Sequence, residues 1–548
     1  MDERRYRFGP LERRGVIAGW RGGQIVSVVA GLAVAGVALQ SGSGVLSVAL
    51  GVAGAVAGVL VAVWPVGGRT AEEWLPTVTV WAWEQASGRS RARSPQPGAG
   101  HVLAGSRGRA AAASAAGGAL ADTGVAPREA PREAPRESFR PASRIPAPLA
   151  GVALLEVGSR LGVLFDRAAG TLTAAVAVQG HDFALAGAGE RQRRTAAWSD
   201  LLAGLAREGS PVRRVQWSVC VLPDDGRGVA GHLAEQGVLG PAHPARASYA
   251  ALLAASATGT CRHEVLVALQ VAAERRRLAG STRGAAALAP ACSVLERELA
   301  AVCGRLADAD VEVTGPLRAR QLAALLRRTG EATPPAPEPP AFAEGGPGAG
   351  ADGAAWRPGA PAPGGAVPGV AISEDAGSRW PWPMSVEARW DCLRTDATWH
   401  ATYWIAEWPR IDVGPDFLAP LLLGSVRRTV SVVMEPLSPS EALRRAERAR
   451  TADVADAELR RRGGFLATAR RAREEETVRR READLADGHG SFRLSGYVTV
   501  TATSPEFLAE SCRATEQAAA QARLELRRLY GDQLRAFTCS LPLCRGLS

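Results

Sequence analysis

Seven histidines and eight cysteines are the residues of this chain most suited to act as metal ligands, bases or nucleophiles. No two cysteines form a C-x-x-C pair, and no two histidines have the i,i+4 spacing of an HExxH zinc site. The pairs His263–Glu264 and His181–Asp182 are adjacent, but neighbours in a strand point to opposite faces of a sheet. The sequence therefore predicts no catalytic, cofactor or metal site. The cysteines are expected as small core residues in a reducing compartment.

A second chemical constraint comes from lysine, which is absent, so that all 65 basic residues are arginine. A P-loop nucleotide site, a protein kinase, a Schiff-base enzyme and a Ser-Lys hydrolase each need a lysine. These classes are excluded, and we expect a protein that is not an enzyme. The net charge of +10 favours contact with an anionic membrane surface. Whether the arginines also bind nucleic acid stays open.

The elements that must position any site begin with two uncharged apolar runs at 24–39 and 45–64, separated by the short QSGSG sequence. A helix rises 1.5 Å per residue, so the second run has the length needed to cross a bilayer. Five connecting residues allow only a tight antiparallel turn. The pattern predicts a transmembrane hairpin rather than a cleaved signal peptide.

Charge decides the orientation of this hairpin. Arginines precede the first run and follow the second, while the turn carries no charge, so the positive-inside rule places both termini in the cytoplasm. We expect Trp20, Arg21, Trp64 and Arg69 at the membrane interface, where aromatic and basic residues anchor helix ends. The expected location is the plasma membrane, with the lipid bilayer as a partner.

Small residues in the second run predict how the two helices pack. Gly51, Gly54 and Gly58 recur at spacings that allow close backbone approach to Gly31 and Ala35 of the first run. The same face could also mediate a homo-oligomer, and the sequence leaves that alternative open.

Composition divides the remainder into linkers and folded units. Residues 1–87 hold the basic lead-in, the hairpin and a juxtamembrane segment. Residues 88–148 form a disordered Arg/Ala/Pro linker, and 331–369 form a Pro/Gly linker. We expect cytoplasmic α+β domains at 149–330 and 370–548, the second with a long charged helical hairpin. Within the juxtamembrane segment, the tryptophans of 67–87 fit either an interfacial helix or the start of the soluble core.

Each folded unit mixes strand and helix periodicity. In the first, strands are predicted at 171–180, 212–222, 263–271 and 311–314, with helices at 189–208, 246–257 and 287–307. In the second, strands are predicted at 399–408, 426–434, 492–501 and 534–541, with helices from 439 to 484 and from 505 to 530. The expected fold class is α+β, with two ferredoxin-like sandwich domains behind the transmembrane hairpin.

Several sequence features together resemble a known family. They are the basic lead-in, the two small-residue spans, the strand ending Trp408-Pro409, the strand closing in Met434 to Leu437, the YVTVT strand and the LRRLYGDQLRAFTCSLPL ending. The chain resembles actinobacterial membrane proteins of integrative conjugative elements, whose N-terminal helices are PrgI-like. Their soluble part is similar to the non-ATPase N-terminal region of type IV secretion ATPases.

This resemblance implies a structural role at the membrane in conjugation or type IV secretion, with a cytoplasmic ATPase or coupling protein as partner. The missing Walker lysine agrees with the lack of a motor domain. Two alternatives stay open. One is a type VII secretion component, which also has two N-terminal spans, and the other is a membrane-bound enzyme using the scattered histidines and carboxylates.

Overall fold

The computed structural model describes most of the chain. The described residues are 22–93, 148–223, 231, 233, 238, 240, 243–256, 261–273, 284–331, 382–462, 476, 479–480, 483–485 and 489–546, except 41, 43, 64, 67–68, 159, 181–182 and 184. The basic lead-in, nearly all of both predicted linkers, and most of the second arm of the charged helical hairpin lie outside this set.

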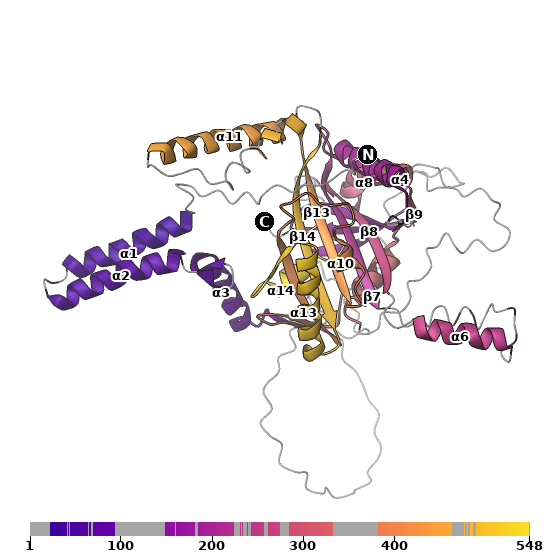
Figure 1. Cartoon of the computed structure of the whole chain (residues 1–548), viewed down its shortest axis with the longest axis horizontal. Coiled ribbons are helices and arrows are strands. Elements are labelled where there is room, and N and C mark those ends of the chain that lie inside the picture. The colour runs from indigo at the N-terminus through magenta and orange to yellow at the C-terminus, as the bar shows by residue number, and fades with distance from the viewer. Residues whose placement is uncertain are drawn as a thin grey trace, which may run out of the picture.

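The N-terminal part is helical. Helices α1 (Gly22–Gln40) and α2 (Val45–Val63) form an antiparallel pair and are long and apolar enough to be candidate membrane spans. A two-strand turn of β1 (Pro65–Val66) and β2 (Arg69–Thr70) leads into α3 (Ala71–Ala86) and the short strand β3 (Arg91–Arg93). Figure 1 shows α3 between the end of the hairpin and a large sheet.

Residues 148–331, here called the first half, alternate strands and helices. The elements are β4 (Val152–Val157), β5 (Leu161–Asp166), β6 (Thr171–Gly180), α4 (Ala188–Leu205), β7 (Val212–Pro223), α6 (Pro244–Ser256), β8 (Cys261–Ala272), α8 (Gly284–Asp308), β9 (Val311–Pro316) and α9 (Ala319–Arg328). The four predicted strands of this region are confirmed as β6, β7, β8 and β9. The hairpin of β4 and β5 was not predicted.

Residues 382–546 form the second half. Its elements are β10 (Ser385–Ala388), β11 (Leu393–Thr395), β12 (Thr398–Glu407), α10 (Ala419–Leu422), β13 (Arg428–Leu437), α11 (Pro439–Arg462), β14 (Ser491–Ala502), α13 (Pro505–Gln521), β15 (Glu525–Arg528) and α14 (Gln533–Thr538). Ser504 caps α13 by accepting a hydrogen bond from the Phe507 amide, as its sequence predicts.

The predicted final strand at 534–541 is wrong. Residues 533–538 form α14, and the last strand is the polar β15, which lies inside the predicted helix 505–530. Leu534, Ala536 and Phe537 are all buried because α14 is enclosed between the sheet and the C-terminal residues. Burial on several sides removes the one-sided pattern by which a helix is recognised.

The strands of both halves form one antiparallel sheet of 13 strands, in the order β3-β10-β11-β12-β14-β13-β7-β8-β6-β5-β4, with β15 paired to β12 and β9 to β6. The expectation of two separate sandwiches therefore does not hold among the described residues. The halves join where β7 pairs with β13 over seven positions. Either strand alone would be an open edge with unpaired backbone groups, and pairing removes both edges.

The two halves repeat the same topology. Strands β6, β7, β8 and β9 lie in the order β9-β6-β8-β7, and β12, β13, β14 and β15 lie in the order β15-β12-β14-β13. Each set follows a hairpin, β4–β5 or β10–β11, whose second strand pairs with the start of β6 or β12. Helices α6 and α11 occupy the same connection in each half and both project from the sheet (Figure 1).

The strand register supports this repeat residue by residue. Ser218 lies opposite Ser431 in the β7·β13 pair. Three residues earlier, Val215 pairs with Leu269, which pairs with Ala174, the fourth residue of β6. In the second half, the path from Arg428 through Val500 reaches Ala401, the fourth residue of β12. A pseudo-two-fold axis therefore passes between the two serines, perpendicular to the sheet.

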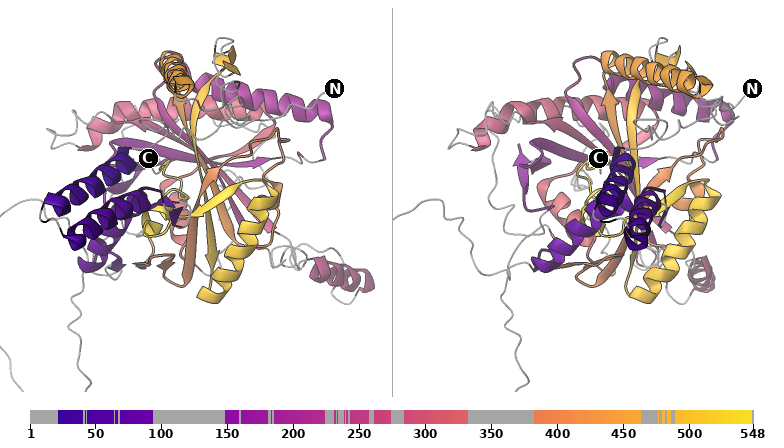
Figure 2. Two further views of the ribbon diagram at one scale, coloured as in Figure 1. Left: turned by 60° about the vertical axis from the view of Figure 1, so that its left-hand side comes forward. Right: turned by 90° about the vertical axis from the view of Figure 1, so that its left-hand side faces the viewer.

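Helices cover both faces of the sheet (Figure 2). Val432 packs in the core with α4 and α8, and Val430 packs in the core with α13. These valines are two residues apart on β13, so all three helices cover one face. Val433 points to the opposite face, where it joins Ala536 of α14. Helix α9 lies on that second face, and the side-chain contacts that join the two halves lie on the same face.

Candidate functional site

Arg427 links the two halves at their junction. It precedes β13 in the second half, yet its Nη1 donates to the carbonyl oxygen of Glu331 at 2.6 Å and its Nη2 to that of Arg328 at 3.2 Å. Both carbonyls follow or end α9 of the first half. The last carbonyls of a helix have no intrahelical donor and carry partial negative charge, so a cation there stabilises the helix end. Arg427 thus fixes α9 against the second half.

Glu264 of β8 accepts from two arginines beside this contact. Arg328 Nη2 lies 2.7 Å and Arg262 Nη2 lies 3.1 Å from the same carboxylate oxygen. The Glu264 and Arg328 side chains are only 15% and 12% exposed. Removing one member of such a pair would leave a buried charge without its partner. The network therefore favours one fixed arrangement of α9 on the sheet.

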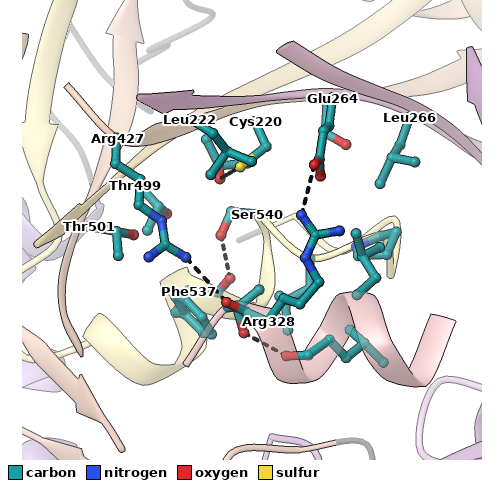
Figure 3. Close-up of a pocket in the computed structure, with 17 residues that line it drawn as sticks. Cys220, Leu222, Glu264, Leu266, Arg328, Arg427, Thr499, Thr501, Phe537 and Ser540 are labelled. Carbon is teal, nitrogen blue, oxygen red and sulfur yellow. Dashed lines mark hydrogen bonds and ion pairs between the residues drawn. The ribbon is translucent and has the colours of Figure 1, made fainter. Parts of the chain in front are cut away.

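A cavity of about 70 Å³ lies between these groups. Figure 3 shows Arg427 on one side and Arg328 with Glu264 on the other. The strands contribute hydroxyl and thiol groups, and α9 and the chain after α14 cover them. The lining is Ser218, Cys220, Leu222, Glu264, Leu266, Leu325, Leu326, Arg328, Thr329, Arg427, Thr429, Thr499, Thr501, Phe537, Ser540, Leu541 and Pro542. The cavity is large enough and polar enough to hold water.

His400 lies beside the cavity but is enclosed. Its Nε2 lies 2.7 Å from Thr395 Oγ1 and 3.0 Å from Thr398 Oγ1, and its Nδ1 lies 2.9 Å from Thr501 Oγ1. The ring also packs on Phe537, with the ring centroids 4.7 Å apart. Burial, helped by the charge of Arg427, lowers the pKa of His400 to about 3. The ring is therefore neutral near pH 7, and its nitrogens serve the threonine network.

Six of the eight cysteines are buried core residues, as predicted, whereas Cys220 and Cys261 are half-buried. Burial raises the pKa of Cys292 to about 11 and the pKa values of Cys303, Cys392 and Cys539 to about 12. Burial also raises the pKa of Cys220, the thiol in the cavity lining. The raised pKa values disfavour the thiolate, which is the nucleophilic form of cysteine. These surroundings therefore do not activate the cysteines as nucleophiles.

The C-terminal segment, residues 539–546, crosses from the second half onto the first. Buried Gln216 of β7 donates to the carbonyl oxygen of Leu541 at 2.8 Å and accepts from the Cys544 amide at 2.7 Å. Arg545 reaches Asp166 of β5 with 2.5 Å between Nη2 and Oδ2. Burial opposes ionisation of Asp166, but hydrogen bonds from Ala169 and Arg545 outweigh it and lower its pKa. The segment therefore holds the halves together.

Helix α3 is attached to the second half by aromatic packing. Trp74 stacks on Trp390 with 5.7 Å between ring centroids, and Trp81 packs against the same ring in a T-shaped arrangement with 5.0 Å between centroids. Tyr530 completes this aromatic cluster, with its ring centroid 6.1 Å from that of Trp74 and 6.4 Å from that of Trp390. Gln85 Nε2 donates to the carbonyl oxygen of Ala388 at 3.1 Å, and β3 pairs with β10. The chain thus joins the sheet directly after the hairpin.

The predicted interface residues fall largely outside the described set. Trp20, Arg21 and Trp64 lie outside it, and Arg69 is in β2 without a described side chain. The predicted packing glycines lie between the helices. A Cβ on Gly58 would lie 2.8 Å from the Cα of Gly31, and one on Gly51 would lie 3.3 Å from the carbonyl oxygen of Ala35. Gly54 faces Val34 in the same way, with 3.0 Å to its Cγ1.

The histidine–carboxylate pair in β8 does not share a site. His263 is exposed, with Nε2 2.6 Å from the carbonyl oxygen of Leu422, while Glu264 faces the cavity. His181 and Asp182 lie outside the described residues. Within the described part of the chain, no group of three His, Cys, Asp or Glu side chains could hold a metal ion.

Comparison with known proteins gives no assignment. No protein-family model matches the chain. No curated protein sequence matches it either. The junction and the aromatic cluster were not predicted from the sequence. Arg427, Trp390 and Gln216 carry no motif, and the one sequence signal was the density of tryptophan around residues 74–83 and 380–408.

Proposed function

We propose that this protein is a membrane-anchored scaffold of a conjugation or type IV secretion-like apparatus, which docks a cytoplasmic ATPase or coupling protein. The observation that carries the proposal is the attachment of α3 to Trp390 and Tyr530. It connects two candidate membrane spans to a broad sheet through a helix that only residues 64–70 separate from α2. A flexible tether would localise the sheet, whereas a packed joint also orients it.

The proposed topology is that of an integral protein with both termini in the cytoplasm, as the arginine distribution favours. Each half is proposed to be a ferredoxin-like unit. Its support is the shared strand order, in which the first of four strands lies between the fourth and the third. The proposed docking elements are the outer surfaces of the two ferredoxin-like units and α11, whose sequence mixes arginine and acidic residues.

The neutral, enclosed His400 and the high thiol pKa values support a structural role over an enzymatic one. In the described part of the chain, these groups are bonded or buried rather than presented to a substrate. The resemblance to proteins of integrative conjugative elements supports the choice of apparatus.

Co-purification from native membranes tests the proposal. The tagged protein is expected to recover an ATPase or coupling protein and transfer components, identified by mass spectrometry, and to hydrolyse no nucleotide alone. Recovery of type VII secretion components would move the role to that apparatus. Recovery of neither, or nucleotide turnover by the isolated chain, would contradict the scaffold assignment.

A further inference from the structure

Helix α3 has two different faces. Trp74, Thr77, Trp81, Glu84 and Gln85 recur at helical spacing and face the second half, as their contacts with Trp390, Gly531, Arg535 and Ala388 indicate. Burial raises the pKa of Glu84, with Arg535 opposing that rise. This inner face binds the sheet.

The outer face of α3 is apolar and exposed. It carries Leu75, Ala82 and Trp83, flanked by Val78 and Val80, and none of the ten residues from Trp74 to Trp83 is charged. Leu75 is 59% and Trp83 53% exposed, and both valines are also exposed. An uncharged, solvent-facing stripe on a helix that is already packed on its other side indicates a further contact.

The position of α3 identifies the partner. Seven residues, 64–70, separate it from the end of α2, so the helix lies beside the cytoplasmic end of the proposed spans. Figure 1 shows the hairpin on one side of α3 and the sheet on the other. Arg89 stacks over Trp83 with 4.2 Å from its guanidinium carbon to the ring centroid. Tryptophan and arginine together are typical of the headgroup region.

We propose that the outer face of α3 lies in the headgroup and upper acyl region of the same phospholipid bilayer, while its inner face holds the sheet. This inference rests on the proposed membrane anchoring and deepens it. Helix α3 then lies between the lipid and the sheet. Because the aromatic cluster packs α3 against the second half, it fixes the orientation of the sheet relative to the membrane plane. The two interpretations of 67–87, interfacial helix and start of the soluble core, both apply, one to each face.

Lipid-dependent quenching in the full chain tests this placement. The protein is reconstituted in vesicles of phosphatidylcholine and phosphatidylglycerol, and single cysteines introduced as Leu75→Cys, Val56→Cys and Ser199→Cys are labelled with an environment-sensitive fluorophore. Val56 is exposed near the middle of α2, and Ser199 is exposed on α4, across the sheet from the hairpin. Protein without an introduced cysteine gives the labelling blank.

The label at Leu75 is expected to show blue-shifted emission and strong quenching by lipids with a shallow nitroxide, and weak quenching by a deep one. Val56 should show the reverse order, and Ser199 no quenching. Adding Val78→Glu and Trp83→Glu should abolish quenching at Leu75 and leave Val56 unchanged.

Two results would overturn the proposal while leaving the anchor intact. In one, the label at Leu75 shows the emission of a water-exposed site and is as unquenched as the label at Ser199. In the other, the label at Leu75 is blue-shifted but lipid nitroxides do not quench it, which would place protein on this face. In both, Val56 remains quenched. Loss of quenching at Val56 itself would instead contradict membrane anchoring.

Discussion

Ser218 of β7 lies directly opposite Ser431 of β13, at the centre of a sheet whose two sides repeat the same strand order. Both serines are buried, and Gln216 donates to Ser431 Oγ at 2.9 Å. The chain therefore resembles a dimer of two similar halves that are joined in one polypeptide and pair through their central strands. The interface between the halves consists of the hydrogen-bond ladder between β7 and β13, the C-terminal segment and the contact made by Arg427.

Cutting the chain between the halves should not separate them. A specific protease site placed within residues 332–381 is expected to give two fragments that elute together in gel filtration, because β7·β13 pairing and the C-terminal segment remain. The uncut protein without protease is the control. Elution as two separate fragments without denaturant would show that the halves are independent domains.

Gln216→Ala is expected to lower the free energy of unfolding by about 3 kcal/mol. The change leaves the Cys544 amide and the Leu541 carbonyl without the partners they have in the folded protein, and buried unpaired polar groups are costly. Urea denaturation of the detergent-solubilised protein measures it. The matched control is Gln179→Ala at an exposed position of β6, which should change little. Equal changes in the free energy of unfolding for the two variants would show that Gln216 does not hold the C-terminal segment.

Gly531→Ala should loosen α3 from the second half more than Gly88→Ala does. Both glycines have positive φ, +76° and +68°, so both substitutions carry a backbone cost of about 1 kcal/mol. Only at Gly531 would the new Cβ lie 2.8 Å from Trp390 Cζ3 and from Thr77 Cγ2. Proteolytic cleavage after Arg89 or Arg91 should be faster in the Gly531 variant. Equal rates would show that this contact does not hold α3.

Gly58→Leu should separate α1 from α2. The helices cross so closely at Gly31 that no side chain fits between them, whereas Gly36 has open space around it. Gln24→Cys and Ala62→Cys, placed where Gln24 Nε2 donates to the carbonyl oxygen of Ala62 at 2.8 Å, report the pairing by disulfide formation. The yield is expected to drop with Gly58→Leu and persist with Gly36→Leu. A yield unchanged by Gly58→Leu would contradict the close crossing.

His400 should make stability depend on pH below neutrality. Burial and Arg427 lower its folded pKa to about 3, so the unfolded chain binds the proton more readily. The stabilisation is complete above the unfolded pKa of about 6.5 and is lost as pH falls toward 3. Between pH 7 and 5 the loss is about 2 kcal/mol.

The measurement is the slope of the unfolding free energy against pH, compared between the native protein and His400→Gln. Thr395, Thr398 and Thr501, which contact the ring, do not titrate in this range. The variant is expected to be less stable at pH 7 and to have a shallower slope. An unchanged slope would mean that His400 is accessible to protons in the folded state.

Periodicity was sufficient to predict most individual elements. The strands at 171–180 and 212–223 were recognised from the alternating pattern of their sequences, although the structure buries most of their residues on both faces of the sheet. It failed for α14 and β15. The first is buried on several sides, and the second is polar and short, so neither has the pattern that its structure type normally shows.

The sequence by itself determined the apolar hairpin, the excluded lysine chemistry and the α+β class, because these depend on composition and on periods within one segment. Only the tertiary structure decided that β7 pairs with β13, that Arg427 donates to the carbonyl groups at the C-terminal end of α9, and that Trp390 packs against α3. Those relationships join residues from about a hundred to more than three hundred positions apart. No local pattern specifies them, because edge pairing and side-chain contacts depend on which surfaces the completed halves present to each other.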